Sequence, residues 1–352
     1  MDDLSTNSER KESAASTENE TRTFSHISGI SQPNSRYRNV YYRSEDVQFA
    51  ATPFAPHCSE HEGFNLGAVL RKRGFVLSEN AFLGKGRFGK VYKALHIESD
   101  KEMAIKIIDK QKLSFTTRFK FLPREIRGWQ KLHHRHIVEL FHYFEEDQKV
   151  FFATQLAEKG DLLSYIQKNG PQTEHLAQSW MWQLVSAVQY MHLQWIAHRD
   201  LKLDNILLFS DNNVKISDFG LCRDEIKSEH ELSMTYCGSK AFMAPEVLLA
   251  LPHPPFKADV WSLGIIAFAL LTNRYPFDHR ATIIRMIKAQ RSRAYRFPER
   301  IKISAACRYT IDALLTYDFA MRPTIHQASV LPWLFGGPDN IRDYSRRQNR
   351  NA

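Results

Sequence analysis

Cysteine is scarce in this 352-residue chain, which has four cysteines and no Cys-x-x-Cys pair. This scarcity excludes a disulfide-stabilised miniprotein and a structural zinc site, and it favours a reducing intracellular compartment. The first thirteen residues contain no apolar stretch, so we expect no secretory signal there. We therefore expect a cytoplasmic protein, with the nucleus as a further compartment.

Long apolar runs are also missing. The longest, residues 260–271, is interrupted by Ser262 and Gly264 and is too short to cross about 30 Å of hydrocarbon. We expect a buried core helix at this run and no membrane partner. Overall, 43% of residues are hydrophobic and 25% are charged, which excludes a wholly disordered chain and a collagen-like fibre.

Positive charge is in excess but unevenly spread. The whole chain has a net charge of +9. Residues 1–64 carry a net charge of −4, so residues 65–352 carry +13. Such an excess could steer anionic partners, including nucleic acid or acidic proteins. The densest basic cluster, residues 285–300, lacks the aromatic stacking pattern and the module of a nucleic-acid binder. We therefore favour a solvated basic surface on a protein that handles phosphates, and we expect no specific nucleic-acid binding.

The chain divides into three parts. The first 35 residues contain 12 Ser or Thr and almost no large apolar side chain, so we expect disorder there. Residues 36–64 have aromatic residues without a clear period and are predicted to be a linker. We expect one domain over residues 65–335, with lobes at about 65–155 and 156–335, and a polar tail over residues 336–352.

Periodicity predicts strands in the first half of the domain and helices in the second. Segments between Phe75 and Ile108 alternate as strands do, and a helix with Pro123 near its start follows. Helical periodicity then recurs in four segments: 173–192, 259–272, 281–290 and 304–315. Together they predict an α+β, two-lobed architecture.

The segment Gly84-Lys85-Gly86-Arg87-Phe88-Gly89 matches Gly-x-Gly-x-x-Gly. A dinucleotide-binding site would open a helix at the third glycine, whereas here an alternating strand pattern continues through Val91. A strand–loop–strand hairpin lets bare backbone N–H groups approach a triphosphate. An ordinary glycine-rich hairpin is the alternative. Further along, Lys106 in an apolar strand needs an anionic partner, either Glu125 of the next helix or phosphate oxygens.

The most specific pattern is a set of motifs in order: His198-Arg199-Asp200-Leu201-Lys202-Leu203-Asp204-Asn205, Asp218-Phe219-Gly220 and Ala244-Pro245-Glu246. Phosphoryl transfer needs an aligned hydroxyl, metal ions that bridge the phosphates, and neutralised charge. Asp200 can accept the hydroxyl proton, and Lys202 can offset charge on the moving group. Asn205 and Asp218 offer hard oxygen ligands for Mg²⁺.

These motifs resemble a eukaryotic protein kinase catalytic domain over residues 75–335. Shorter phrases resemble the testis-specific serine/threonine kinase family, in the calcium/calmodulin-kinase-like group: RKRGF at 71–75, FLPREI at 121–126, LAEKGDLLSYI at 156–166 and TYCGSKAFMAPEVL at 235–248. The resemblance implies a serine/threonine kinase with ATP and Mg²⁺ as cofactors, protein substrates as partners, and a role in spermatid development. Lys202, two residues after Asp200, supports serine/threonine rather than tyrosine specificity.

The resemblance also implies roles for individual residues. It places ATP at Leu83, Gly84, Lys85, Gly86, Arg87, Phe88, Gly89, Val91, Ala104, Lys106, Glu125, Gln155, Ala157 and Leu207. It places the gatekeeper at Thr154, an internal spine at Trp129, Leu140, His198 and Phe219, an ion pair between Glu246 and Arg322, and a brace for the catalytic loop at Asp259.

Three residues depart from the family pattern. Lys240 replaces a common proline in the substrate loop, and Gln155 replaces a usual acidic hinge residue whose side chain does not read adenine. Trp129 is bulkier than the usual aliphatic residue and could shift the helix that carries Glu125. We expect that helix to need help to close.

Substrate choice and regulation follow from the same resemblance. Asp161 and Asp204 predict a preference for basic residues upstream of the acceptor Ser or Thr, and Ser239 is expected to bond Asp200 and Lys202. Thr235 is the predicted activating phosphosite for an upstream kinase. Its phosphate is expected to pair with Arg199 and Arg223, which would otherwise face each other as like charges. The short tail after Trp333 does not predict calmodulin control.

Two other classes of function stay open at this stage. A pseudokinase scaffold would bind nucleotide and partner proteins without turnover, but the complete set of Lys106, Asp200, Asn205 and Asp218 argues against it. A basic nucleic-acid-binding protein is the other alternative, and the missing stacking module argues against that.

Overall fold

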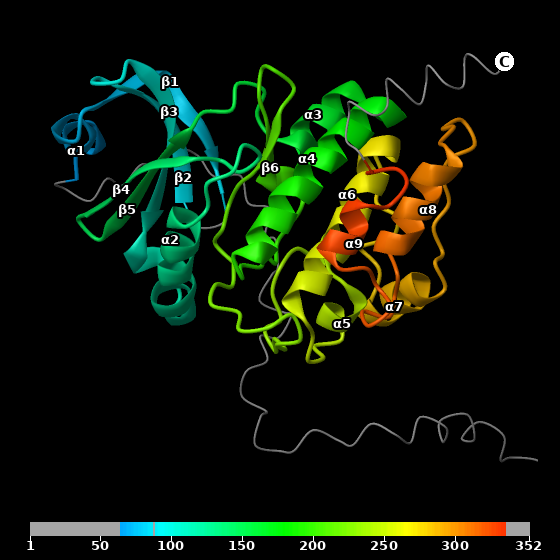
Figure 1. Cartoon of the computed structure of the whole chain (residues 1–352). Coiled ribbons are helices and arrows are strands. Elements are labelled where there is room, and N and C mark those ends of the chain that lie inside the picture. Colours follow the sequence, from blue (N-terminus) through cyan, green and yellow to red (C-terminus); the bar gives the residue numbers. More distant parts are fainter. Residues whose placement is uncertain (1–63, 87–88, 336–352) are drawn as a thin grey trace, which may run out of the picture. The chain divides into compact units, whose positions relative to one another are not determined.

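Five antiparallel strands form the sheet of the N-terminal lobe in the order β1-β2-β3-β5-β4 (Figure 1). They are β1 (Phe75–Lys85), β2 (Gly89–His96), β3 (Lys101–Asp109), β4 (Leu140–Glu146) and β5 (Lys149–Gln155). Along β3, Met103, Ile105 and Ile107 are buried on one face of the sheet. Because side chains alternate along a strand, Lys106 lies on the opposite face.

The computed structural model describes residues 64–86 and 89–335. Within them, the predicted α+β class with a β-rich and a helical lobe is confirmed. The predictions of disorder or a linker up to residue 63, of phosphate contacts at Arg87 and Phe88, and of a polar tail over 336–352 lie outside the described residues.

Helix α1 (Leu66–Lys72) precedes the sheet and was not predicted. The side chain of Asn65 caps it by accepting a hydrogen bond from the N–H of Ala68 at 3.0 Å. Val69 and Leu70 are buried in the same cluster as residues of β1 and β3. The sequence does carry the signal, since a capping Asn is followed by apolar residues at helical spacing.

Helix α2 (Leu122–Gln130) packs beside the sheet and is the helix that Pro123 predicted. One face of it is buried and includes Glu125, Gly128 and Trp129. The next strands, β4 and β5, return the chain to the sheet and end at the hinge after Gln155.

The C-terminal lobe is helical. Its elements are α3 (Leu162–Asn169), α4 (Glu174–Leu193), α5 (Pro245–Leu248), α6 (Pro255–Thr272), α7 (Ile283–Arg291), α8 (Ala305–Leu314) and α9 (Ile325–Ser329), with the hairpin β6 (Ile206–Leu208) and β7 (Val214–Ile216). The four predicted helices correspond to α4, α6, α7 and α8.

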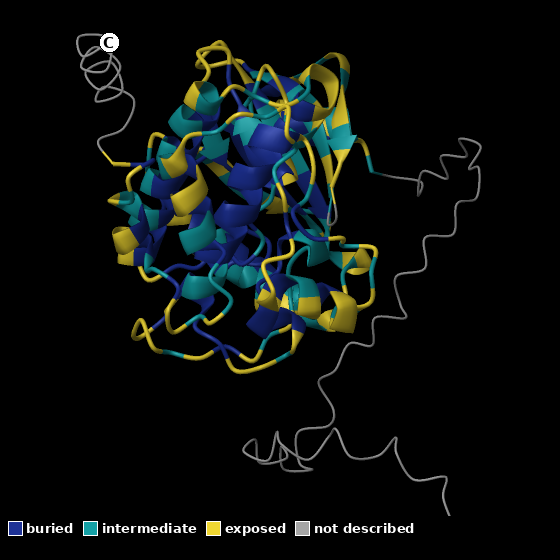
Figure 2. Cartoon of the chain, turned by 90° about the vertical axis from the view of Figure 1, so that its right-hand side faces the viewer, coloured by how far each residue is buried: buried dark blue, intermediate teal, exposed yellow. Residues whose placement is uncertain are grey.

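Helix α6 contains the longest apolar run. Its length and composition would suit a membrane span, but it is buried inside the lobe, as the dark blue helices in Figure 2 illustrate. We interpret it as the core helix that the sequence predicted. Asp259 lies in its first half, so this buried helix carries a residue that contacts the functional site.

Candidate active site

Lys106 forms two ion pairs, one within the N-terminal lobe and one to the C-terminal lobe. Its Nζ atom lies 2.7 Å from Oε1 of Glu125 on α2 and 2.8 Å from Oδ1 of Asp218. Burial alone would lower the pKa of Lys106, but the carboxylates of Asp218 and Glu125 raise it above its usual value. Burial would likewise raise the pKa of Asp218, yet Lys106 holds it below its usual value. Burial also raises the pKa of Glu125 above its usual value, aided by the nearby Asp218 and opposed by Lys106. The predicted Lys106–Glu125 contact is confirmed.

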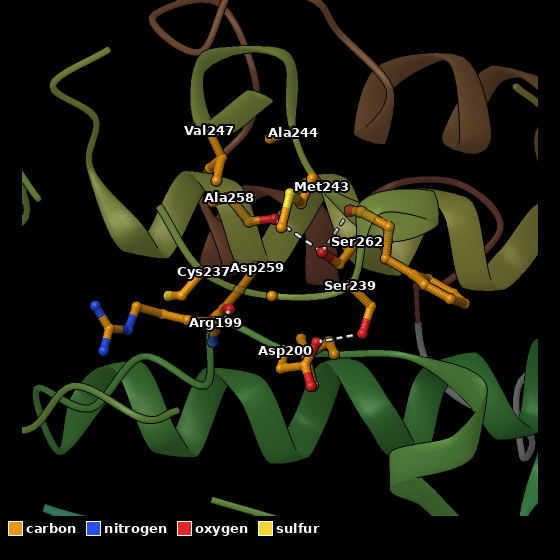
Figure 3. A pocket seen from close by; sticks show the side chains of 13 residues that line it. Arg199, Asp200, Cys237, Ser239, Met243, Ala244, Val247, Ala258, Asp259 and Ser262 are labelled. Carbon is orange, nitrogen blue, oxygen red and sulfur yellow. Dashed lines mark hydrogen bonds between the residues drawn. The ribbon is translucent and has the colours of Figure 1, made fainter. Parts of the chain in front are cut away.

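Asp200 is held by neighbours on both oxygens. Ser239 donates a hydrogen bond to its Oδ1 at 2.8 Å, and Figure 3 shows the two side chains pointing toward each other. The Nζ of Lys202 lies 3.5 Å from Oδ2, and Asn205 donates to the backbone oxygen of Asp200 at 2.9 Å and to Oδ2 at 3.3 Å. The catalytic candidates predicted from the loop thus lie together.

Helix α6 holds the backbone of the catalytic loop through Asp259. Asp259 accepts hydrogen bonds from the backbone N–H groups of His198 at 2.9 Å and Arg199 at 2.8 Å, as predicted. Arg199 and Asp218 both have left-handed backbone conformations, with φ of 65° and 60°. Non-glycine residues in this region are strained and persist where the surroundings fix them, commonly at functional sites.

The glycine-rich hairpin joins β1 to β2. A Cβ atom at Gly84 would meet nothing within 4 Å, whereas one at Gly89 would lie 2.2 Å from the backbone oxygen of Ile107. Gly89 is therefore required for packing of β2 against β3, and Gly84 is the position where bare backbone is open to a ligand. Gly86 closes the turn by donating to the carbonyl of Gly89 at 2.9 Å.

The predicted adenine-binding residues come from three elements. Val91 pairs with Lys106 in the sheet, Ala104 pairs with the gatekeeper Thr154, and Leu207 lies on β6. At the hinge, the N–H of Gln155 donates to the carbonyl of Glu139 at 3.1 Å, so this group is already used. The predicted role of the hinge backbone in reading adenine therefore rests on its other groups, including those of Ala157. Leu83, at the end of β1, is exposed.

Trp129 packs in the core without keeping Glu125 of α2 away from Lys106. The indole lies 5.3 Å from the ring of Phe219, which in turn lies 5.3 Å from His198. Its Nε1–H donates to the carbonyl of Val138 at 2.8 Å, so the polar atom is satisfied in the core. The helix therefore accommodates the larger ring while Glu125 still reaches Lys106. Leu140, the fourth predicted spine residue, packs partly buried against the same core.

Mg²⁺ fits the donor set at the loop. Asp218 offers a carboxylate. The side-chain nitrogen of Asn205 donates to Asp200, so the side-chain oxygen of Asn205 is left as an acceptor for Mg²⁺. In residues 64–86 and 89–335, no group of three or more His, Cys, Asp or Glu could hold a metal by itself. Mg²⁺ is usually bound by one or two protein oxygens together with substrate phosphates, so this sparse set suits it.

The two predicted substrate carboxylates differ in their surroundings. Asp161 caps α3, since its oxygens accept hydrogen bonds from the N–H and the hydroxyl of Ser164, both at 2.8 Å. Asp204 is exposed on the 3₁₀ turn Leu203–Asn205, which packs against α3. Lys240, the departure in the substrate loop, donates to the carbonyl of Ala281 at 2.7 Å and so ties this loop to the segment before α7. Of the two predicted partners of Ser239, only the bond to Asp200 is found there.

The two arginines near Thr235 lie close enough for their like charges to interact, as expected, and each also has partners of its own. Arg223 forms an ion pair with Glu231 and donates to the carbonyl of Leu232 at 3.3 Å. Arg199 donates to the carbonyl of Leu221 at 2.8 Å. Burial lowers the pKa of Arg223, opposed by Glu231 and aided by the nearby Arg199 and Arg124. Glu231, an acidic residue that the sequence analysis did not single out, partly offsets the charge of Arg223, while the like charge of Arg199 still acts on that group.

Comparison with known proteins agrees with this geometry. A family model described as the protein kinase domain matches residues 77–334. The chain belongs to the protein kinase family. Testis-specific serine/threonine-protein kinase 3 of Mus musculus is 38% identical over 75% of this chain and 97% of its own length. Testis-specific serine/threonine-protein kinase 1 of Mus musculus is 38% identical over 72% of this chain and 70% of its own. CBL-interacting protein kinase 15 of Oryza sativa subsp. japonica is 37% identical over 59% of this chain and 49% of its own length.

Membership of the family agrees with the predicted resemblance and with the motif order. The ion pair between Glu246 and Arg322, expected from the same resemblance, is bidentate at 2.7 and 2.9 Å and buried. It fixes the end of the activation segment of the kinase domain, the stretch from Asp218 to Glu246, to the helical lobe.

Proposed function

We propose that this chain transfers the γ-phosphate of ATP to serine or threonine hydroxyls of protein substrates. The observation that carries the proposal is the simultaneous pairing of Lys106 with Glu125 and Asp218, together with the contact of Ser239 with Asp200. The first supports a role for Lys106 in neutralising phosphate charge, and the second supports a role for Asp200 as acceptor of a hydroxyl proton.

Each residue has a task in the proposed reaction. Asp200 accepts the proton of the substrate hydroxyl, and Lys202 offsets charge on the transferred phosphoryl group. Lys106 holds phosphate oxygens while Glu125 fixes its direction. Asn205 and Asp218 would hold Mg²⁺, which supplies charge neutralisation across the phosphates when bound. Asp259 of α6 holds the backbone of His198 and Arg199 and so helps to preorganise the loop that carries Asp200.

The proposal is tested by radiolabelled ATP transfer to a basic peptide with purified full-length protein, with an Asp218→Ala variant beside it. A pseudokinase scaffold would bind Mg²⁺-ATP without transfer, so nucleotide binding measured on the same samples separates the two functions.

We propose that the substrates carry Arg or Lys about three residues before the acceptor. Replacing Asp161 or Asp204 with asparagine is expected to raise the KM for such a peptide about fivefold, since a part-exposed ion pair contributes about 1 kcal/mol at most. Asparagine retains the helix cap at position 161, so the fold is preserved. The measurement compares peptides with Arg or Ala at that position.

Only the Arg peptide is expected to respond. Glu158→Gln serves as a control, because Glu158 accepts a hydrogen bond from the N–H of Ser210 in the β6–β7 hairpin. A peptide library that selects acidic or proline-directed sequences would rule the preference out.

We propose that an upstream kinase activates the protein at Thr235. Because Glu231 already pairs with Arg223, loss of the phosphate in Thr235→Ala is expected to cost only about tenfold in kcat, equivalent to one charge-assisted hydrogen bond. The double variant Thr235→Ala/Glu231→Gln is expected to lose considerably more. The assay compares specific activity with phosphate occupancy from phosphopeptide mapping, and equal activity with and without the phosphate would refute the switch.

We propose a role in the testis, in spermatid development. The support is the names of the mouse relatives to which this chain is similar.

A further inference from the structure

A buried carboxylate lies at the start of the activation segment, outside the catalytic set. Asp224 follows Asp218 by six residues, and its side chain is only 1% exposed. Arg127 approaches it with two nitrogens, Nε 3.1 Å from Oδ2 and Nη2 3.5 Å from Oδ1, and Nε of Arg124 lies 4.0 Å from Oδ1. Because a buried charge is costly without partners, this geometry is maintained only while the arginines stay in place.

Both arginines belong to α2, the helix that carries Glu125. Arg124 precedes Glu125 directly, and Arg127 follows it by two residues. The helix therefore contacts β3 through Glu125 and Lys106, and it contacts the activation segment through Arg127 and Asp224.

A second contact brings the same two segments together. A Cβ atom at Gly128 would lie 2.9 Å from the Sγ atom of Cys222, and this Sγ donates to the carbonyl of Arg124 at 3.5 Å. Glycine at 128 is unfavourable within a helix by about 1 kcal/mol relative to alanine. Its absence of a side chain lets α2 approach the segment after Asp218 closely enough for the ion pair to form.

The segment is also fixed on its other side. Between Cys222 and Asp224, the backbone of Arg223 pairs with that of Ala197, with N–H to O distances of 2.9 and 3.0 Å in the two directions. Ala197 directly precedes the His198-Arg199-Asp200 motif. Residues 222–224 thus connect α2 to the catalytic loop.

We infer that Asp224 is a positioning residue that holds α2, through Arg127 and Arg124, where Glu125 reaches Lys106. The inference rests on the proposed function, and it concerns a residue pair that neither the motifs nor the spine includes. Loss of the Asp224 charge releases α2 without removing any group that contacts substrate or nucleotide.

The test uses full-length protein with Asp224→Asn, and with Glu225→Gln as a matched control that removes the neighbouring exposed carboxylate. Asp224→Asn is expected to lower kcat about tenfold and to raise the KM for ATP, with the KM for the peptide unchanged. Hydrogen exchange of the amides in residues 122–130 is expected to speed up at least about fivefold while the C-lobe helices keep their protection. Glu225→Gln should match the wild type in both measurements.

Arg127→Gln and the double variant separate coupling from damage. Arg127 is half-exposed, so its replacement should leave the protein folded. Arg127→Gln therefore still tests the ion pair if Asp224→Asn fails to fold. If the two residues act as one unit, the double variant is no worse than Asp224→Asn alone. Wild-type kcat and exchange in Asp224→Asn would overturn the inference. A fall in kcat that matches a smaller folded fraction, with faster exchange in every helix, would overturn it too. If the wild type transfers no phosphate, the proposed function fails, while the exchange measurement still decides the role of Asp224.

Discussion

Replacing Lys106 with methionine, or Asp218 with asparagine, is expected to lower phosphoryl transfer by at least about two orders of magnitude. Lys106 lies within 2.8 Å of Asp218 and within 2.7 Å of Glu125, so its ammonium group is fixed at the meeting point of the lobes. Methionine has a similar length but carries no charge, which leaves the developing negative charge of the transition state unneutralised. Asparagine at 218 removes the anionic oxygen that would hold Mg²⁺.

The measurement is the initial rate of transfer at saturating ATP and peptide. Lys93→Met is a suitable control, because Lys93 lies on the neighbouring strand β2 and pairs with Glu102 at 2.5 Å away from the catalytic loop. The control should retain wild-type turnover. Near-wild-type rates in both Lys106→Met and Asp218→Asn would contradict the assignment of these residues.

The sequence predicted the catalytic residues better than the long-range contacts that surround them. The motif that contains Asp200 and Asn205 is local, so backbone geometry over a few residues brings its groups together. The pairing of Lys106 with Glu125 was expected because a charged residue in an apolar strand needs a partner, and the next helix offered one. The pairing of Glu246 with Arg322 joins residues 76 positions apart, and only the family resemblance indicated it.

The residues that were missed depend on long-range contacts. The ion pair of Asp224 with Arg127 spans 97 positions, and no local pattern marks Asp224 as buried. Glu231 lies in a polar loop, where an acidic residue is ordinarily solvated. The packing of Trp129 was missed for the same reason, since the carbonyl that accepts its N–H and the ring of Phe219 come from other elements. Side-chain size alone did not show that this pocket was large enough.

Arg322→Met is expected to destabilise the kinase domain by about 3–5 kcal/mol, because it leaves the buried carboxylate of Glu246 without its partner. Arg322 is itself 1% exposed and also donates to the carbonyls of Thr316, Lys257 and Tyr317 at 2.9, 2.8 and 3.2 Å. All of these acceptors lose a donor at once. The melting temperature should fall by about 10 °C for a domain of this size.

The same change should also loosen the activation segment, since Glu246 fixes its end to the helical lobe. The double variant Arg322→Met/Glu246→Leu removes both charges and is expected to recover part of the stability, because replacing a buried pair by apolar groups costs less than breaking it. Arg308→Met is the control, as Arg308 is exposed and contacts only the face of Phe297 among the described interactions. A melting temperature for Arg322→Met equal to that of Arg308→Met would show that the carboxylate of Glu246 finds water or another donor when Arg322 is removed.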